Sequence, residues 1–182
     1  VTSTGRISST EPNLQNIPIK TELGEEIRKC FVAEPGHTLI AVDYSQIQLR
    51  LLAEVANVKM FKDTFNAGQD IHEQTARKIF KIPDSTIVPK DLRRAAKTIN
   101  FSIIYGISAF GLANQLNVSR EEAKRIIDSY MAGLPEIKNY IEYITEFVLK
   151  NHCVYTPWGR RIEIPEAASP RMRGYATRAA IN

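Results

Sequence analysis

The pattern of apolar and polar positions predicts a chain that is mainly helical. Apolar residues recur at intervals of three and four along several stretches, which is the periodicity of one buried helix face. One of these stretches, residues 135–150, carries Ile137, Ile141, Ile144 and Val148 on a single face. The helices predicted in this way cover approximately residues 46–56, 71–80, 90–106, 110–116, 119–131 and 135–150.

Strand signals are few. The apolar run at residues 39–42 is short, as expected of a buried strand, and residues 154–164 predict a β-hairpin that turns at residues 157–159. Residues 1–20 are rich in Ser, Thr, Asn and Pro, which is typical of irregular backbone. The predicted fold class is therefore α+β and mainly helical, with little sheet.

Composition narrows the class of protein only slightly. The 182 residues are 43% hydrophobic, which is enough for a sizeable core, and the net charge of +4 weakly favours a polyanionic partner. Cys30 and Cys153 are isolated, form no metal-ligand pattern and fit a reducing cytosol. The chain shows no secretory signal and no apolar run of the ~20 residues that span a bilayer, so we expect no membrane partner.

One helix face combines positive charge with aromatic rings. Arg93, Lys97, Phe101 and Tyr105 follow each other at four-residue steps, and each step overshoots one helical turn by only about 40°. Two cations suit a polyphosphate, and two flat rings suit a sugar and a base. The alternative is an ordinary amphipathic helix with a solvated basic start and a buried aromatic end.

An acidic residue follows the apolar run at residues 39–42 and precedes the helix that begins near Gln46. A carboxylate at the tip of a strand can lean into a cleft, and Asp43 could bind Mg²⁺ there. The alternative is a solvated turn or N-cap residue.

Four segments resemble motifs of the family A DNA polymerases. VDYSQIQLR, residues 42–50, resembles motif A, and RRAAKTINFSIIYG, residues 93–106, resembles motif B. TGRISSTEPNLQNIP, residues 4–18, is similar to the segment before motif A, and DIHEQTA, residues 70–76, to the start of the fingers domain. The resemblance implies template-directed DNA synthesis from dNTPs in replication and repair, and a cytoplasmic location of the bacterial type.

The resemblance also implies residue roles in catalysis and nucleotide binding. Asp43 and the backbone carbonyl of Tyr44 would bind a pair of Mg²⁺ ions. Arg93, Lys97 and His72 would bind the triphosphate, and Lys97 would also donate a proton to the departing pyrophosphate.

Three further residues are implied to form the rest of the nucleotide pocket. Phe101 would pack against the sugar and base, and Tyr105 would close the pocket near the templating base. Gln48 occupies a position where the family carries Glu, which bonds the motif B tyrosine and blocks a ribose 2′-hydroxyl. Because Gln has nearly the same length, we expect Gln48 to remain such a gate. Ser102 also departs from the family, which has Gly there.

Contacts with primer-template DNA are implied for the residues before motif A. Arginine and side-chain amides can bond to the minor-groove acceptors that every base pair presents. The residues expected to do so are Arg6, Asn13, Gln15 and Asn16.

The resemblance predicts a partial polymerase. Residues 1–56 would be part of the palm with a small part of its antiparallel sheet, residues 57–150 the fingers, and residues 151–182 a hairpin returning toward the palm. The family's motif C, with its His-Asp-Glu triplet and second metal carboxylate, does not occur in the 182 residues. We therefore expect this chain to need the remaining polymerase domains and to be inactive alone.

Three alternatives remain open. Residues 110–130 resemble a helix-turn-helix, which would make the protein a non-catalytic DNA-binding module. Single-subunit RNA polymerases have a related motif B, although residues 5–18 and Phe101 favour the DNA enzymes. The third alternative is an interaction domain that kept the fold and lost the chemistry.

Overall fold

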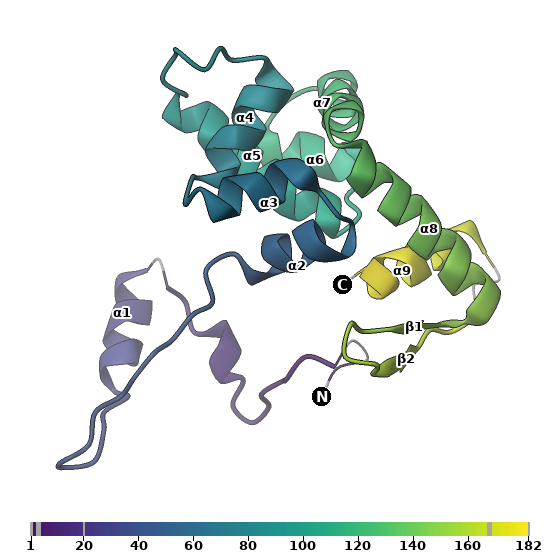
Figure 1. Ribbon diagram of the computed structural model, residues 1–182. Helices are drawn as coiled ribbons and strands as arrows, with labels where there is room; N and C mark the ends of the chain where they lie inside the picture. The colour runs from purple at the N-terminus through teal and green to yellow at the C-terminus, as the bar shows by residue number, and fades with distance from the viewer. Residues whose placement is uncertain (1, 3–4, 20, 167–168, 182) are drawn as a thin grey trace. The chain divides into compact units, whose positions relative to one another are not determined.

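The chain forms two separate units. The structure is a computed structural model that describes residues 2, 5–19, 21–166 and 169–181, so the predicted domain ends Val1 and Asn182 lie outside it. The first unit is Val1–Ser45 and the second is Gln46–Asn182. Figure 1 shows that nearly all regular structure of the described residues belongs to the second unit.

The described residues of the first unit form one short 3-10 helix, η1 (Leu14–Asn16), and one α-helix, α1 (Glu22–Lys29). The hydroxyl of Thr21 caps α1 by accepting a hydrogen bond from the backbone N–H of Gly24 at 3.1 Å. Acidic residues occupy the first turn of α1 and basic residues its last turn, which complements the helix dipole. The backbone of residues 5–13 is irregular, as the sequence predicts.

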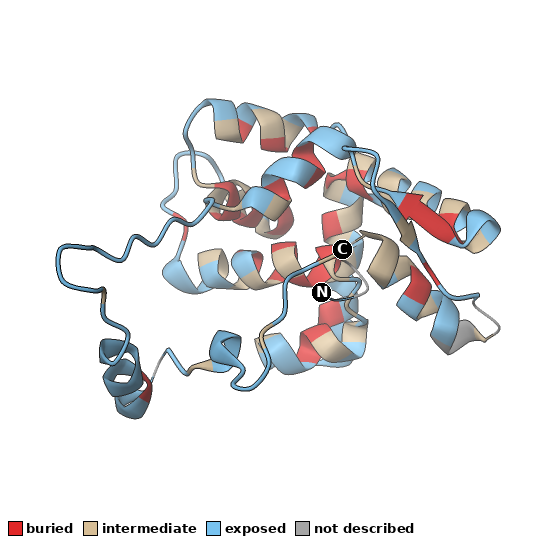
Figure 2. Ribbon diagram, turned by 90° about the horizontal axis from the view of Figure 1, so that it is seen from below, coloured by how far each residue is buried: buried red, intermediate tan, exposed pale blue. Residues whose placement is uncertain are grey.

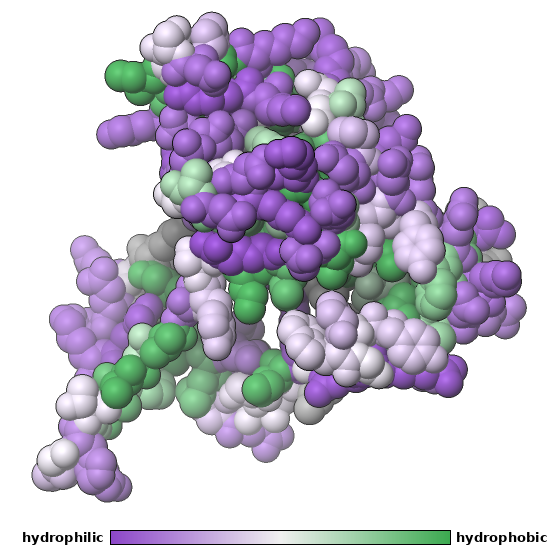
Figure 3. Space-filling model, viewed as in Figure 1, coloured by the Kyte–Doolittle hydropathy of each residue, from purple (hydrophilic) through white to green (hydrophobic). Residues whose placement is uncertain are grey.

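The strand predicted at residues 39–42 is wrong for this structure. The segment is extended but irregular, and the side chains of Leu39, Ile40 and Val42 are 63%, 83% and 83% exposed. A strand requires a neighbour for its backbone hydrogen bonds, and no described segment pairs with this one. Figure 3 shows the resulting row of apolar, green side chains along the extended part of the first unit. The expected part of the palm sheet is therefore missing from the described residues.

The described part of the second unit is a helical assembly with one hairpin. The six helices whose ranges were predicted are all present, with ends that agree to within a few residues. Its elements are α2 (Ile47–Val55), α3 (Lys59–Asn66), α4 (Ile71–Phe80), α5 (Lys90–Ile104), α6 (Ala109–Leu116), α7 (Arg120–Gly133), α8 (Pro135–Asn151), β1 (Cys153–Tyr155), β2 (Arg161–Glu163) and α9 (Pro170–Ile181).

Helices α2 to α8 enclose the main hydrophobic core. Leu49, Phe61, Ile71, Ile99 and Leu112 are fully buried there, and Figure 2 shows the buried positions on the inward faces of the helices. Because α4 and α5 pack closely on each other, residues from both helices lie close together.

A smaller core joins the hairpin to two helices. Val148 of α8, Val154 of β1, Ile164 and Ala176 of α9 are buried together. Strands β1 and β2 pair antiparallel with Val154 opposite Ile162, which confirms the predicted hairpin. None of the described helices has the length and apolar character required to cross a membrane.

The main core contains one polar defect. The Tyr130 side chain of α7 is fully buried, and its hydroxyl is the single buried side-chain polar atom without a hydrogen-bond partner among the described residues. Burial raises the pKa of this phenol above its ordinary value, because the charged form would lie in an apolar surrounding.

Candidate functional site

Helix α5 carries the predicted cationic and aromatic stripe, and its two ends are sharply defined. It begins after Pro89, a residue that suits a helix start because its lack of an N–H costs nothing there. It ends at Ile104, and the φ of +64° at Gly106 allows the N–H of Ile107 to bond the carbonyl of Ser102 at 3.0 Å. The N–H of Gly106 bonds the carbonyl of Ile103 at 2.9 Å, and these two bonds together form a Schellman turn.

Arg93 is held by an acid at the start of α4. The Oδ1 atom of Asp70 accepts hydrogen bonds from the backbone N–H groups of His72 and Glu73, at 2.8 and 3.1 Å. Its Oδ2 atom accepts from the Nε of Arg93 at 2.9 Å and also from Nη2. Partial burial acts to raise the pKa of Asp70, but the Arg93 guanidinium and the two backbone bonds outweigh it, so this pKa is lowered.

His72 lies on α4 and is almost fully buried, with 2% of its surface exposed. Its Nδ1 atom is 3.1 Å from the side-chain nitrogen of Asn100 on α5. Burial lowers the pKa of His72, the charges of Arg93 and Lys97 lower it further, and Asp70 opposes them. His72 is therefore neutral near pH 7.

The helical spacing locates Lys97. Lys97 follows Arg93 by four residues on α5, so it shares the side of the helix from which Arg93 pairs with Asp70 at the start of α4. Its side chain is exposed and has no ion-pair partner among the described residues. The structure thus brings together three of the predicted triphosphate ligands, two of which carry positive charge.

The two rings follow along α5. Phe101 is half-buried, and its ring contacts the His72 ring with centroids 5.8 Å apart. The hydroxyl of Tyr105 donates a hydrogen bond to Oε1 of Gln48, on α2, at 2.7 Å. Gln48 thus makes with Tyr105 the hydrogen bond that the resemblance gives to Glu in the family.

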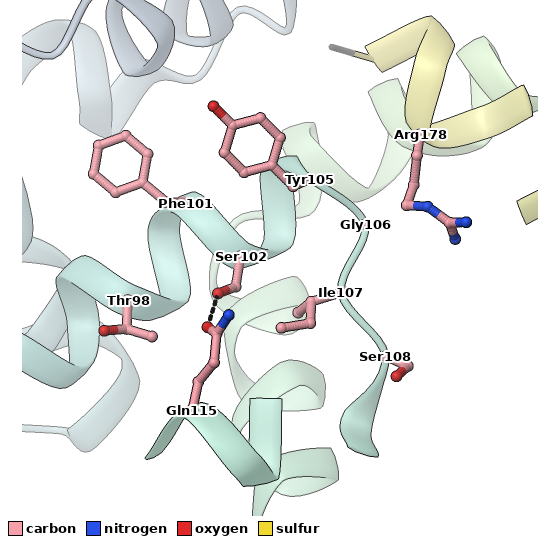
Figure 4. A pocket seen from close by; sticks show the side chains of 9 residues that line it. All are labelled: Thr98, Phe101, Ser102, Tyr105, Gly106, Ile107, Ser108, Gln115 and Arg178. Carbon is pink, nitrogen blue, oxygen red and sulfur yellow. Dashed lines mark hydrogen bonds between the residues drawn. The ribbon is translucent and has the colours of Figure 1, made fainter. Parts of the chain in front are cut away.

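A pocket of about 510 Å³ adjoins the two rings. Figure 4 shows Phe101 and Tyr105 projecting from the same side of α5, with Arg178 of α9 beyond the turn at Gly106. Ser102 donates a hydrogen bond to Oε1 of Gln115 at 2.6 Å, which satisfies the hydroxyl that the family lacks at this position. The pocket therefore combines aromatic faces with one guanidinium, as binding of a nucleobase and a phosphate requires.

The predicted metal ligands Asp43 and Tyr44 belong to the first unit, where both are exposed. No group of three or more His, Cys, Asp or Glu side chains that could hold a metal ion exists among the described residues. A single carboxylate with a neighbouring carbonyl nevertheless fits Mg²⁺, which takes one or two carboxylates and completes its shell with water and phosphate oxygens.

The predicted DNA contacts also belong to the first unit, where all four residues are exposed around η1. Asn13 caps η1 by accepting a hydrogen bond from the N–H of Gln15 at 3.1 Å, and the Gln15 side chain donates to the carbonyl of Ile7 at 3.1 Å. Arg6 and Asn16 are the other two residues predicted to contact DNA.

Sequence reasoning missed three residues of the site: Asp70, Asn100 and Arg178. Asp70 had a detectable signal, since an acid directly before a predicted helix is a typical N-cap. The ion pair of Asp70 with Arg93, 23 positions away, had no signal in the sequence. Asn100 lies inside motif B, where a buried amide cannot be told from an exposed one without the partner helix.

Comparison with known proteins agrees with this arrangement. The family model described as DNA polymerase family A matches residues 1–182. The chain is 49% identical to the DNA polymerase I of Rhizobium leguminosarum and 47% identical to that of Pseudomonas aeruginosa, in each case over 100% of this chain. These alignments cover 18% and 20% of the relatives, so the chain spans about a fifth of their length.

A solved structure is also similar. It is described as the POL domain of Pol1 from M. smegmatis in complex with DNA primer-template and dNTP, and it matches with a TM-score of 0.86 and 38% identity. The match covers 100% of this chain and 32% of that one. Since the family accounts for α6 and α7 too, the helix-turn-helix and RNA polymerase alternatives are not retained. The chain belongs to DNA polymerase family A.

Proposed function

We propose that this chain forms the nucleotide-binding part of a polymerase that adds deoxynucleotides to a primer 3′-hydroxyl under the direction of a template. One observation carries the proposal: Arg93, Lys97, His72, Phe101 and Tyr105 lie on one connected face of α4 and α5. The similar POL domain, whose title names primer-template and dNTP, supports the same substrates for this chain.

The cationic end of the stripe would bind the triphosphate. Arg93 uses Nε and Nη2 for Asp70, which leaves its Nη1 edge for a phosphate oxygen. Lys97, exposed and without an acidic partner among the described residues, would bind a second oxygen and donate a proton to the departing pyrophosphate. Neutral His72 would contribute a hydrogen bond without a charge.

The aromatic end would bind the sugar and base. Phe101 would pack on the nucleotide, and Tyr105 would close the pocket near the templating base. Gln48, fixed to Tyr105 by the 2.7 Å hydrogen bond, would stand where a ribose 2′-hydroxyl would need space. Deoxyribose preference would therefore survive the replacement of Glu by Gln.

The metal site would be shared with the substrate. Asp43 and the carbonyl of Tyr44 would hold Mg²⁺ together with phosphate oxygens and residues that this chain lacks. Two such ions supply activation of the primer hydroxyl and stabilisation of the leaving group when bound. The family alone supports metal dependence, and the choice of Mg²⁺ rests on the oxygen donors.

The remaining assignments follow from the same function. Residues 1–56 would be palm, with Arg6, Asn13, Gln15 and Asn16 along the primer-template, residues 57–150 fingers, and residues 151–182 a return toward the palm. Because the chain spans about a fifth of its relatives and lacks motif C, it would not extend a primer by itself. The relatives are bacterial polymerases, and we place this chain in the cytoplasm on that ground.

Nucleotide titration tests the proposal. The wild-type chain should bind a dNTP with Mg²⁺, and Lys97→Ala should weaken binding at least about tenfold, since it removes one charged phosphate contact. Lys124→Ala, which removes an equally exposed lysine from α7, is the matched control and should bind as the wild type does. Equal affinity of Lys97→Ala and the wild type would refute the proposed triphosphate site.

A further inference from the structure

Three polar side chains form a buried network between α4 and α5. Thr75 and Asn100 are fully buried, and His72 is 2% exposed. The side-chain nitrogen of Asn100 is 3.1 Å from the Thr75 hydroxyl and 3.1 Å from Nδ1 of His72. Buried polar groups of this kind are costly unless every one is satisfied, so their donor and acceptor roles are fixed.

The direction of these hydrogen bonds follows from Thr75. Its hydroxyl has one proton and two possible acceptors, the carbonyl of Ile71 at 2.7 Å and Oδ1 of Asn100 at 3.3 Å, and we assign the proton to the shorter contact with Ile71. The same hydroxyl must then accept from Asn100, which turns the amide nitrogen of Asn100 toward both partners. Since the nitrogen donates its second proton to His72, Nδ1 of the imidazole must be an unprotonated acceptor.

We propose that Asn100 is a positioning residue that holds His72 in the tautomer with its proton on Nε2, and so makes the imidazole a fixed donor toward a phosphate oxygen. The phosphate part of this inference rests on the proposed function. Asn100 itself touches no substrate, because it is fully buried behind His72.

The surroundings of the ring agree with this role. The charged groups that act on His72 are Asp70 on its own helix and Arg93 and Lys97 on α5. Burial and the two cations keep the imidazole neutral, and a neutral ring with Nδ1 as acceptor carries its proton on Nε2.

The Nε2 edge is the part of the ring that remains accessible. Nε2 has no hydrogen-bond partner among the described residues. It would therefore count as a buried polar atom without a partner if it were fully buried, but the single such atom among the described residues is the hydroxyl of Tyr130. Nε2 is therefore not fully buried, and this edge of the ring is available to a ligand.

Nitrogen-15 NMR of the histidine-labelled chain tests the tautomer directly. His72 is distinguished from His37 and His152 by the loss of its signals in His72→Gln. We expect the wild type to show unprotonated Nδ1 and protonated Nε2 at pH 7 and above, where the lowered pKa keeps the ring neutral. A proton on Nδ1 in the wild type would overturn the proposal, and this result needs no variant to fold.

Asn100→Asp tests whether Asn100 causes the tautomer. A carboxylate can only accept, so the proton should move to Nδ1 and the titration midpoint of His72 should rise by about one to three pH units. Asn114→Asp, which adds the same charge on an exposed position of α6, is the control and should leave His72 unchanged. An unchanged tautomer in a folded Asn100→Asp variant would overturn the proposal.

Nucleotide titration tests the consequence. Asn100→Leu and His72→Gln should each weaken dNTP binding about tenfold, and the double variant should lose no more than either alone, because Asn100 acts through His72. Additive losses would overturn the positioning role. If the wild type binds no nucleotide, the proposed function and the phosphate part of this inference fail, while the NMR result still decides the tautomer.

Discussion

Asp70 offers a way to separate two contributions to stability that meet in one carboxyl group. One oxygen caps α4 through two backbone N–H groups, and the other pairs with Arg93 on α5. Asparagine is as good an N-cap as aspartate, so Asp70→Asn keeps the cap and removes the charge. Asp70→Ala removes both.

The expected magnitudes follow from the geometry. Loss of an N-cap costs about 1 kcal/mol of unfolding free energy. The ion pair contributes about 0.5–1 kcal/mol, because both side chains are partly solvated, with 31% of Asp70 and 44% of Arg93 exposed. Asp70→Asn should therefore destabilise the chain by about 0.5–1 kcal/mol and Asp70→Ala by about 1.5–2 kcal/mol.

The effect should also depend on pH. The pKa of Asp70 is lower in the folded chain than its ordinary value of about 3.9, so its contribution is complete above that value. The contribution is lost as the pH falls through the folded pKa. The stability difference between the wild type and Asp70→Asn should accordingly shrink between pH 7 and the most acidic pH at which both remain folded.

Urea denaturation followed by far-ultraviolet circular dichroism measures these differences. Asp63→Asn is a matched control, because Asp63 pairs with Lys59 on an exposed surface where 61% and 82% of the two side chains are solvated. This control should change the unfolding free energy by less than about 0.5 kcal/mol. If Asp70→Asn destabilises as much as Asp70→Ala, the division into cap and pair is wrong. A gap between wild type and Asp70→Asn that does not change with acidity would exclude the charge as its cause.

Three further predictions address the core, the turn and the sugar. Tyr130→Phe removes a hydroxyl that has no partner and should stabilise the chain by about 1 kcal/mol in urea denaturation; destabilisation would mean that the hydroxyl is satisfied. Gly106→Ala should destabilise it by about 1–3 kcal/mol in the same assay, because φ is +64° and the new methyl group would lie 2.7 Å from Cγ of Arg178. In the complete polymerase, Gln48→Ala should lower the preference for dNTP over rNTP at least about tenfold in single-nucleotide incorporation, and an unchanged preference would remove Gln48 from the gate.

The sequence predicted most of the second unit because local signals decide it. Ser119 before α7, Pro135 at the start of α8 and Gly106 after α5 each satisfy or terminate a helix by contacts within a few residues. Helix α1 was missed, although Thr21 as N-cap and the acidic first turn were a usable signal.

The errors concern partners that lie far away in the sequence. Residues 39–42 have a strand pattern, but a strand exists only where a second segment supplies hydrogen bonds. The stripe on α5 predicted the type of ligand, yet it contained no information on Asp70, which holds Arg93, or on the burial of His72. Spacing along one helix reveals which side chains share a face, and the neighbouring helix determines what each of them contacts.

The amide at position 48 has a consequence for the conditions under which the site keeps its shape. A carboxylate bonded to the Tyr105 hydroxyl would take up a proton in acid and become a poorer acceptor. Gln48 holds the same ring at 2.7 Å with a group that cannot be protonated in that range. The hydrogen bond between Tyr105 and Gln48, which joins the end of α5 to α2, should therefore persist in acid. The corresponding bond in a polymerase that has Glu at this position should weaken under the same conditions.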